Sequence, residues 1–248
     1  MPTPFSHLAV AQRLLRDEAL PQTDRDFLKS ELGAFLPGNV AADARVGAGM
    51  PREHTHFYGF SQVITENPWR VMLQKNPDLW TPHSDAQRAF VAGYVAHLAM
   101  DEIWSRQMVL PHFLGREWGS RGFKHIVLHL VLIYMDERDL ATLESWQADH
   151  LRQSKPDHWL PFISDQDLIN WQNLIYDQIK PGGVSQTLEI FGQRISKTPP
   201  ELRAMLDSPA RMQEDLWDNI PREVLVDVEA AMYLHARQSL SEFLSKSG

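Results

Sequence analysis

Two pairs of ionisable residues stand at helical spacing in the middle of the chain. His97 and Asp101 lie in GYVAHLAMDEIW, and His125 and His129 lie in GFKHIVLHL. In a helix, residues four apart share a face with Cβ atoms about 6 Å apart, close enough to hold one ion. Imidazole and carboxylate groups both bind divalent metals. The spacing predicts a metal site, with a buried His–Asp hydrogen bond and separate core histidines as the alternatives.

Other candidate ligands lie before and between these pairs. His7 is near the start of the chain, Asp43 follows a Gly- and Pro-containing stretch, and PREHTHFYGF contains His54 and His56. If that last segment is extended, His54 and His56 point to opposite sides, so at most one of them is expected to be a ligand. His112 follows Pro111 and remains ambiguous.

Asp136 is a possible outer-shell partner of the second pair. It lies seven residues beyond His129 and would share a helix face with it. A carboxylate in that position could orient the imidazole. It could equally be a solvated helix end.

The composition limits the ligands and partners that are available. The 248 residues include no cysteine, which excludes disulfides and thiolate zinc sites. The formal net charge of -8 disfavours non-specific binding to nucleic acid or to anionic lipid surfaces, so no nucleic-acid partner is expected. With 43% hydrophobic and 23% charged residues, the chain is typical of a globular protein. A metal here would be held by imidazole and carboxylate groups.

No segment has the character of a membrane span or a signal peptide. The most apolar run, residues 126–134, is about half the length needed to cross a bilayer. The first twenty residues have no basic leader, continuous apolar core or small-residue cleavage site. We therefore expect a cytoplasmic protein with no transmembrane segment.

The elements that must position these residues are helical nearly everywhere, and no segment is a convincing strand. We expect a single all-α domain over residues 1–248. A break near Lys155-Pro156 would separate a metal-binding half, 1–150, from a C-terminal helical extension, 151–248.

Helix boundaries follow from capping residues and from Gly and Pro. In the first half we expect a helix over 5–20, a second capped by Thr23 or Asp24 and running to about Phe35, and an irregular segment over 36–52. A short helix opens at Asn67-Pro68. Ser84 and Gln87 form a capping box for a central helix through Met108.

The second half continues the pattern. Pro111 is expected to close the central helix, and Ser120 or Gly122 begins the next helix, which runs towards Asp136. Apolar residues at three- and four-residue intervals indicate further helices within 139–153, 164–179 and 185–196, and from about Arg222 to the end.

Five segments follow one another over about residues 5 to 130: PFSHLAVA, AADARV, THFYGF, GYVAHLAMDEIW and GFKHIVLHL. Their order resembles that in the zinc-dependent phospholipase C family, whose fold is shared with the S1/P1 nucleases. The resemblance implies a multi-helix domain of that type. It also implies metal ligands at His7, Asp43, His56, His97, Asp101, His125 and, where the family has Glu, His129.

The resemblance further implies an activity. Members of the family hydrolyse phosphoric esters with a cluster of zinc ions, which would make this chain a phospholipase C-like hydrolase with more than one zinc. A metal-bound hydroxide would attack the phosphorus of a small phosphoester or phospholipid. Asp101 would bridge two ions, and Asp43 would be a ligand or the catalytic base. Where the family has a His after the helical pair this chain has WSRQM, with His112 as the nearest substitute.

The sequence can be compared with what three alternative functions would require. A non-catalytic, ligand-binding or structural helical protein that keeps the metal scaffold is the main alternative. A metallophosphohydrolase built on adjacent His-Asp is disfavoured, because no His is followed directly by Asp. A di-iron bundle needs two Glu-x-x-His motifs, and only Glu53 to His56 fits.

Overall fold

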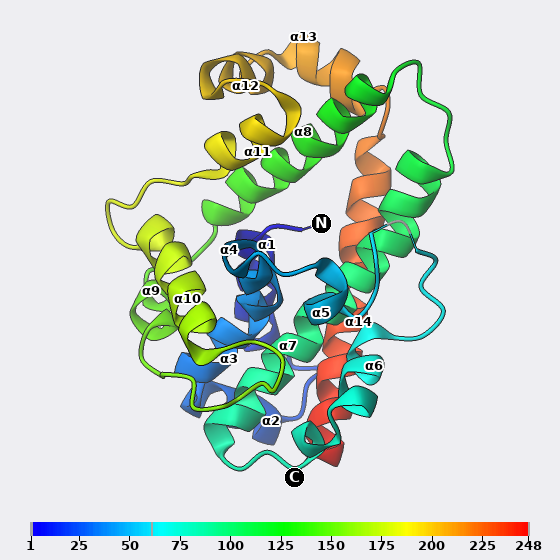
Figure 1. The fold of residues 1–248 in the computed structure, drawn as a ribbon. Coiled ribbons are helices and arrows are strands. Elements are labelled where there is room, and N and C mark those ends of the chain that lie inside the picture. The colour runs from blue at the N-terminus through cyan, green and yellow to red at the C-terminus, as the bar shows by residue number, and fades with distance from the viewer. Residues whose placement is uncertain (1, 61, 248) are drawn as a thin grey trace.

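The computed structural model describes residues 2–60 and 62–247, and within them every regular element is a helix (Figure 1). This confirms the all-α prediction. The helices of the first half are α1 (Pro4–Leu14), α2 (Gln22–Ser30), α3 (Leu32–Val40), η1 (Ala41–Ala44), α4 (Arg45–Ala48), α5 (Arg52–His56), α6 (Pro68–Lys75), η2 (Pro77–Trp80), α7 (Asp85–Ile103) and η3 (Trp104–Leu114). Those of the second half are α8 (Arg121–Leu140), α9 (Trp146–Leu151), α10 (Asp165–Ile179), α11 (Thr187–Ile195), α12 (Pro199–Leu206), α13 (Pro209–Arg211), η4 (Met212–Trp217) and α14 (Arg222–Lys246).

Helices α3 and α7 pack against each other at the centre of the fold, and two glycines allow their close approach. A Cβ atom on Gly38 would lie 2.1 Å from the carbonyl oxygen of Phe90, and one on Gly93 would lie 2.4 Å from that of Phe35. Real Cβ atoms do not come this close to backbone, so only glycine fits either position. The two helices therefore meet backbone to backbone.

The prediction of an irregular segment over 36–52 is wrong. Residues 32–48 are almost continuously helical, as α3, η1 and α4. Gly38 serves helix packing rather than a turn, and Pro37 is accommodated inside α3. The second predicted helix is also divided at Glu31, and α2 begins after Pro21 with no side-chain cap, so Thr23 and Asp24 lie within its first turn.

The central helix begins as predicted but does not end at Pro111. The Ser84 hydroxyl caps α7 by accepting a hydrogen bond from the backbone N–H of Gln87, while the Gln87 side chain accepts one from the N–H of His83. After Ile103 the helix widens into the π-helix η3, which contains Pro111 and ends at Leu114. Pro111 has no backbone N–H to donate, yet the helix continues past it, and the Gly115 N–H donates to the carbonyl oxygen of Leu110, five residues back.

The remaining helices surround this pair. Helix α14 packs along α7, and α10 packs against η1, so elements from both halves of the chain support the same centre. Helix α8 begins at the predicted Ser120 cap and packs against α1 and α11. Helices α11, α12 and α13 lie together at one end of the molecule (Figure 1). In the described part of the chain, none of the helices combines the length and apolarity that a membrane span requires.

Candidate metal centre

Five of the seven predicted metal ligands meet at the centre of the fold. His7 comes from α1, Asp43 from η1, His56 from α5, and His97 and Asp101 from α7. Their ligand atoms form two overlapping groups, in each of which all atoms lie within 4.8 Å of one another: His7, Asp43 and His97, and His56, His97 and Asp101. Four elements separated in sequence therefore deliver imidazoles and carboxylates to one point.

Distances in the centre are those of ligands facing a common point. Asp101 Oδ2 lies 3.2 Å from His56 Nε2 and 3.5 Å from His97 Nε2, and Asp101 Oδ1 lies 3.6 Å from His7 Nε2. His56 Nε2 is also 3.6 Å from Asp43 Oδ1. The His7 and His97 rings stack with centroids 3.7 Å apart.

The atoms that face one another have no hydrogen-bond partner. These orphaned atoms are His7 Nδ1 and Nε2, His56 Nε2, His97 Nε2 and Asp101 Oδ1, and their four residues are 0% exposed. Leaving such an atom buried and unpaired costs about 1–3 kcal/mol. A divalent cation among them would satisfy imidazole and carboxylate lone pairs together, so the donor set fits a metal.

Hydrogen bonds behind the ligands orient them towards that point. His97 Nδ1 lies 2.7 Å from the carbonyl oxygen of Asn39, to which it can only donate, so Nε2 carries the free lone pair. His56 Nδ1 lies 2.9 Å from the Thr55 hydroxyl. The Tyr94 hydroxyl donates to the Thr55 carbonyl and ties α5 to α7. Such outer-shell bonds fix the ring orientation of metal-binding histidines.

Two further residues contact Asp101, and neither was predicted from the sequence. The Arg52 guanidinium donates to Asp101 Oδ2 at 3.3 Å and to the Tyr58 hydroxyl at 2.5 Å. That hydroxyl in turn donates to the Asp101 carbonyl oxygen, at the point where α7 widens into η3. Arg52 lies one helical turn before His56 and therefore shares a face of α5 with it. This spacing could have pointed to Arg52 only if the segment had been expected to be helical; it was expected to be extended. Only one of His54 and His56 faces the centre, as predicted, but the segment is helical and not extended. His56 lies on the buried face of α5, and His54 is exposed.

The charges of the centre are strongly perturbed. Burial opposes ionisation of Asp101, but His97 together with the other two histidines holds the pKa of Asp101 well below its ordinary value. Burial also opposes ionisation of Asp43, yet His97 and His56 lower its pKa. Burial lowers the pKa of His56 to about 3, and burial with the neighbouring His97 lowers the pKa of His7. Burial opposes protonation of His97, but the neighbouring Asp101 raises the pKa of His97. The centre thus presents ionised carboxylates beside neutral His7 and His56, and a metal ion that binds His97 would displace the proton from its Nε2.

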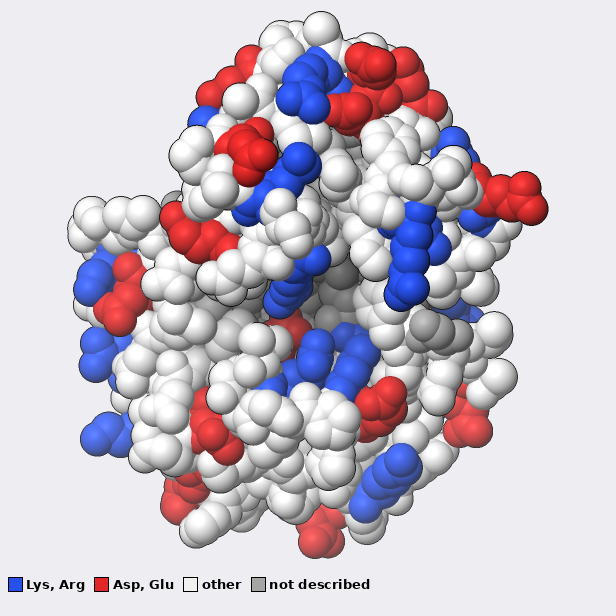
Figure 2. Space-filling model, turned by 45° about the horizontal axis from the view of Figure 1, so that its top comes forward, with Lys and Arg blue, Asp and Glu red and all other residues white. Residues whose placement is uncertain are grey.

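A cavity of about 570 Å³ adjoins the centre. Of the five residues in the centre, Asp43 lines this cavity, and so do Arg45, Arg52 and Arg194. Apolar side chains, including Phe5, Trp171, Ile190 and Phe191, form much of the remaining wall. In Figure 2 basic side chains gather around a hollow in this face of the molecule.

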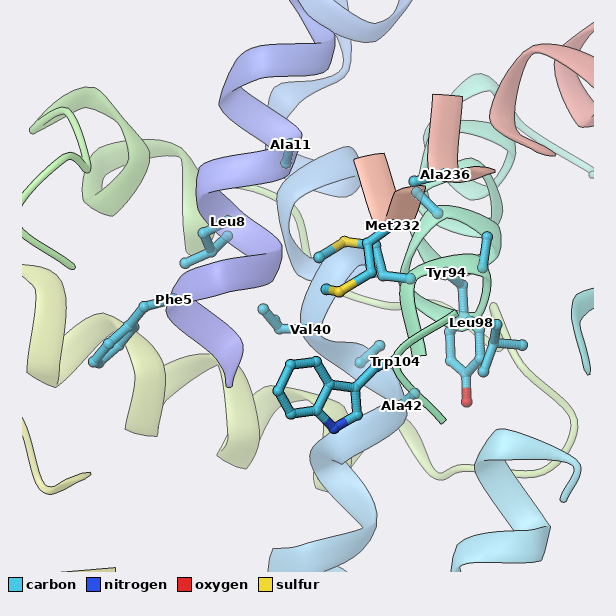
Figure 3. Packing of buried hydrophobic residues seen from close by; sticks show 14 of the residues in the cluster. Phe5, Leu8, Ala11, Val40, Ala42, Tyr94, Leu98, Trp104, Met232 and Ala236 are labelled. Atoms are coloured by element: carbon cyan, nitrogen blue, oxygen red, sulfur yellow. The ribbon is translucent and has the colours of Figure 1, made fainter. Parts of the chain in front are cut away.

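Buried apolar residues pack between the helices that carry or flank the centre. Figure 3 shows buried residues of this core, among them Val40, Ala42, Tyr94, Leu98, Trp104 and Met232. They belong to the same elements that carry or flank the ligands, and Leu98 and Trp104 are each 0% exposed. Close packing of this kind holds the ligand-bearing helices in position.

The structure does not bring the second helical pair to the centre. His125 and His129 belong to neither of the two buried groups. His129 Nδ1 bonds to the carbonyl oxygen of His125, its ring packs edge-on against Phe191, and burial lowers its pKa to about 4. His112, whose carbonyl accepts from Trp118, likewise lies outside these groups.

The predicted roles of Asp136 are both wrong. It is 1% exposed, which excludes a solvated helix end, and it accepts a hydrogen bond from the Thr187 hydroxyl rather than from His129. Burial raises the pKa of Asp136 to about 7. It lies in the wall of the cavity.

Comparison of the chain with protein-family models, with curated proteins and with solved structures found no match. The phospholipase C-type fold and activity therefore stay predictions from the sequence. The buried His and Asp groups, which could hold a metal ion, are the feature on which a function can be based.

Proposed function

We propose that this protein is a metal-dependent hydrolase of phosphoric esters. One observation carries the proposal: unpartnered imidazole nitrogens and carboxylate oxygens converge beside a cavity that also contains three arginines. Metal ligands alone would suit a purely structural site. A cavity with arginines next to them suits an anionic substrate, because the guanidinium group binds phosphate oxygens well.

Zinc is the metal that we propose. The donor set contains three imidazoles and two carboxylates without thiolate, which zinc accepts in catalytic sites. When bound, such an ion lowers the pKa of a water molecule and neutralises charge on phosphoryl oxygens. The residues that would hold it are drawn from His7, His56, His97, Asp43 and Asp101.

Asp43 is the residue that we propose as catalytic base. It is the one member of the centre that also lines the cavity, so a substrate and its attacking water can reach it. Its lowered pKa keeps it ionised at neutral pH, as a proton acceptor must be. Asp101 lies deeper, at 0% exposure, and would act as a ligand only.

The cavity walls indicate the substrate class. Arg45 and Arg194 form no ion pair with a described residue, which leaves both free to bind phosphate oxygens. Phe191 and Trp171 offer apolar surface for the organic part of the ester. A small phosphoester or a phospholipid-type molecule fits both features.

The test combines metal analysis with turnover. Purified protein should contain zinc by inductively coupled plasma mass spectrometry and should hydrolyse one or more of p-nitrophenyl phosphate, bis-p-nitrophenyl phosphate and p-nitrophenylphosphorylcholine. Asp101→Asn should lose metal and activity together. Asp43→Asn should lose turnover while retaining more of the metal, because it leaves the deeper ligands intact. The exposed Asp149→Asn is the matched control and should resemble the parent.

The outcomes separate the competing functions. Metal-free protein that gains no activity with added zinc would overturn the proposal. Metal without turnover on any of the esters would favour a non-catalytic metal-binding protein instead. Unchanged metal content in Asp101→Asn would show that Asp101 is only a hydrogen-bonding partner of His97.

A further inference from the structure

The two ligand groups at the centre cannot both be complete metal sites. His97 belongs to both groups. Its Nδ1 faces the Asn39 carbonyl at 2.7 Å, so only the Nε2 lone pair can bind an ion. An imidazole nitrogen binds one metal at a time. Two ions would leave one group with only two protein ligands, fewer than a catalytic zinc site has.

A carboxylate that bridges two ions would need both oxygens of Asp101. Oδ1 has no hydrogen-bond partner, but Oδ2 already faces the Arg52 guanidinium at 3.3 Å. Arg52 is 7% exposed and is held against Asp101 by the Tyr58 hydroxyl. Oδ2 also faces His56 Nε2 and His97 Nε2. One ion can share this oxygen with Arg52, but a second ion beside it would add a further buried positive charge, which costs free energy in a low-dielectric interior.

The charge of the centre agrees with one ion. Asp43 and Asp101 contribute two negative charges, Arg52 contributes one positive charge, and imidazoles that bind a metal do so as neutral ligands and contribute none. One divalent ion brings this buried cluster to a single positive charge, and a second would bring it to three. Buried charge without compensation is strongly unfavourable.

Arg52 also has hydrogen-bonding capacity to spare. Its Nε and Nη1 are buried and have no partner among the described residues, although the side chain lines the cavity. A guanidinium with unpaired N–H groups beside a metal can bind a tetrahedral oxyanion through two parallel hydrogen bonds.

We propose that the centre holds a single divalent ion and that Arg52 takes the place of a second cation. The ion and Arg52 would then bind oxygens of one and the same phosphoryl group. The metal count stands independently of the proposed hydrolase function, whereas the role assigned to Arg52 towards a phosphoryl group rests on it. Neither measurement below requires turnover, so a failure of hydrolysis alone leaves this inference intact.

The first measurement is the number of ions. Zinc-saturated protein, freed of excess metal by gel filtration, should contain one zinc per chain by native mass spectrometry and by elemental analysis. Two or three tightly bound ions per chain would overturn the inference.

The second measurement is the binding of inorganic phosphate to zinc-loaded protein by isothermal titration calorimetry. Arg52→Gln, with its zinc retained, should bind phosphate about 10- to 100-fold more weakly, the usual loss for charge-assisted hydrogen bonds. Arg52→Lys keeps the charge and should lose less. It also covers the case in which Arg52→Gln fails to fold.

A matched arginine serves as the control. Arg70→Gln removes a surface arginine that pairs with Glu242 and should leave phosphate affinity unchanged. Parent-like phosphate affinity in both Arg52 variants would show that Arg52 only neutralises Asp101, and that result would overturn the proposed role.

Discussion

Replacing Gly93 with alanine tests whether the close contact of α3 and α7 builds the metal centre. The added methyl group would lie 2.4 Å from the Phe35 carbonyl oxygen and 2.8 Å from the Asn39 backbone nitrogen. Neither backbone atom can rotate away, so the helices must separate. Overpacking of this kind costs about 3 kcal/mol, and the better helix propensity of alanine returns about 1 kcal/mol. We expect a net loss of about 2 kcal/mol in the free energy of unfolding.

Gly93→Ala should also weaken metal binding. Separating the helices draws the Asn39 carbonyl away from His97 Nδ1, which it now meets at 2.7 Å. Loss of an outer-shell bond of this kind lowers metal affinity about 10- to 100-fold. Zinc affinity can be measured by competition with a chromogenic chelator.

Urea unfolding and calorimetry measure the stability effect, which corresponds to a melting temperature lower by about 4–8 °C for a chain of this size. Gly122→Ala in α8 is the matched control, because nothing lies within 4 Å of its added Cβ, and it should be at least as stable as the parent. A Gly93→Ala protein with parent stability and parent zinc affinity would refute the link between helix packing and the centre.

Two further predictions concern metal removal and pH. If the centre binds zinc, free zinc at about 100 times the dissociation constant stabilises the folded protein by about 2.7 kcal/mol. A chelator should therefore lower the melting temperature and zinc should restore it; a melting temperature indifferent to both would count against a metal. Burial raises the pKa of Asp136 from 3.8 to about 7. Between pH 4 and pH 7 the folded state therefore keeps a proton on Asp136 that the unfolded chain has lost. Stability should therefore fall as pH rises from 4 to 7, and Asp136→Asn should flatten that part of the curve in urea unfolding; an unchanged slope would contradict this origin.

The sequence was sufficient to predict the helical class and most helix starts. Apolar spacing, the capping residues Ser84 and Ser120 and the proline Pro68 act locally, and the structure confirms them at the starts of α7, α8 and α6. The ends were harder to predict. Pro111 was expected to end the helix, but the helix widens at Trp104, before Pro111 is reached, and continues through the proline to Leu114.

The errors in the first half share a cause. Gly38 is part of the segment 36–52, whose glycine and proline content predicted irregular structure. Here it is needed because Phe90 lies across from it on another helix. A single sequence does not say which backbone will approach, so glycines at helix crossings and glycines in turns look alike.

The two helical pairs show why spacing alone does not identify a metal ligand. His97 and His129 both lie four residues from another potential ligand, and both use Nδ1 in a hydrogen bond to a backbone carbonyl. For His97 that carbonyl belongs to Asn39 on another helix, which turns Nε2 towards Asp101. For His129 it belongs to His125 on the same helix, and the ring lies against Phe191. The position of the acceptor carbonyl, which depends on tertiary packing, decides whether the free nitrogen faces other ligands. A His-x-x-x-Asp pattern therefore becomes evidence for a metal only when a second element is shown to hold the ring.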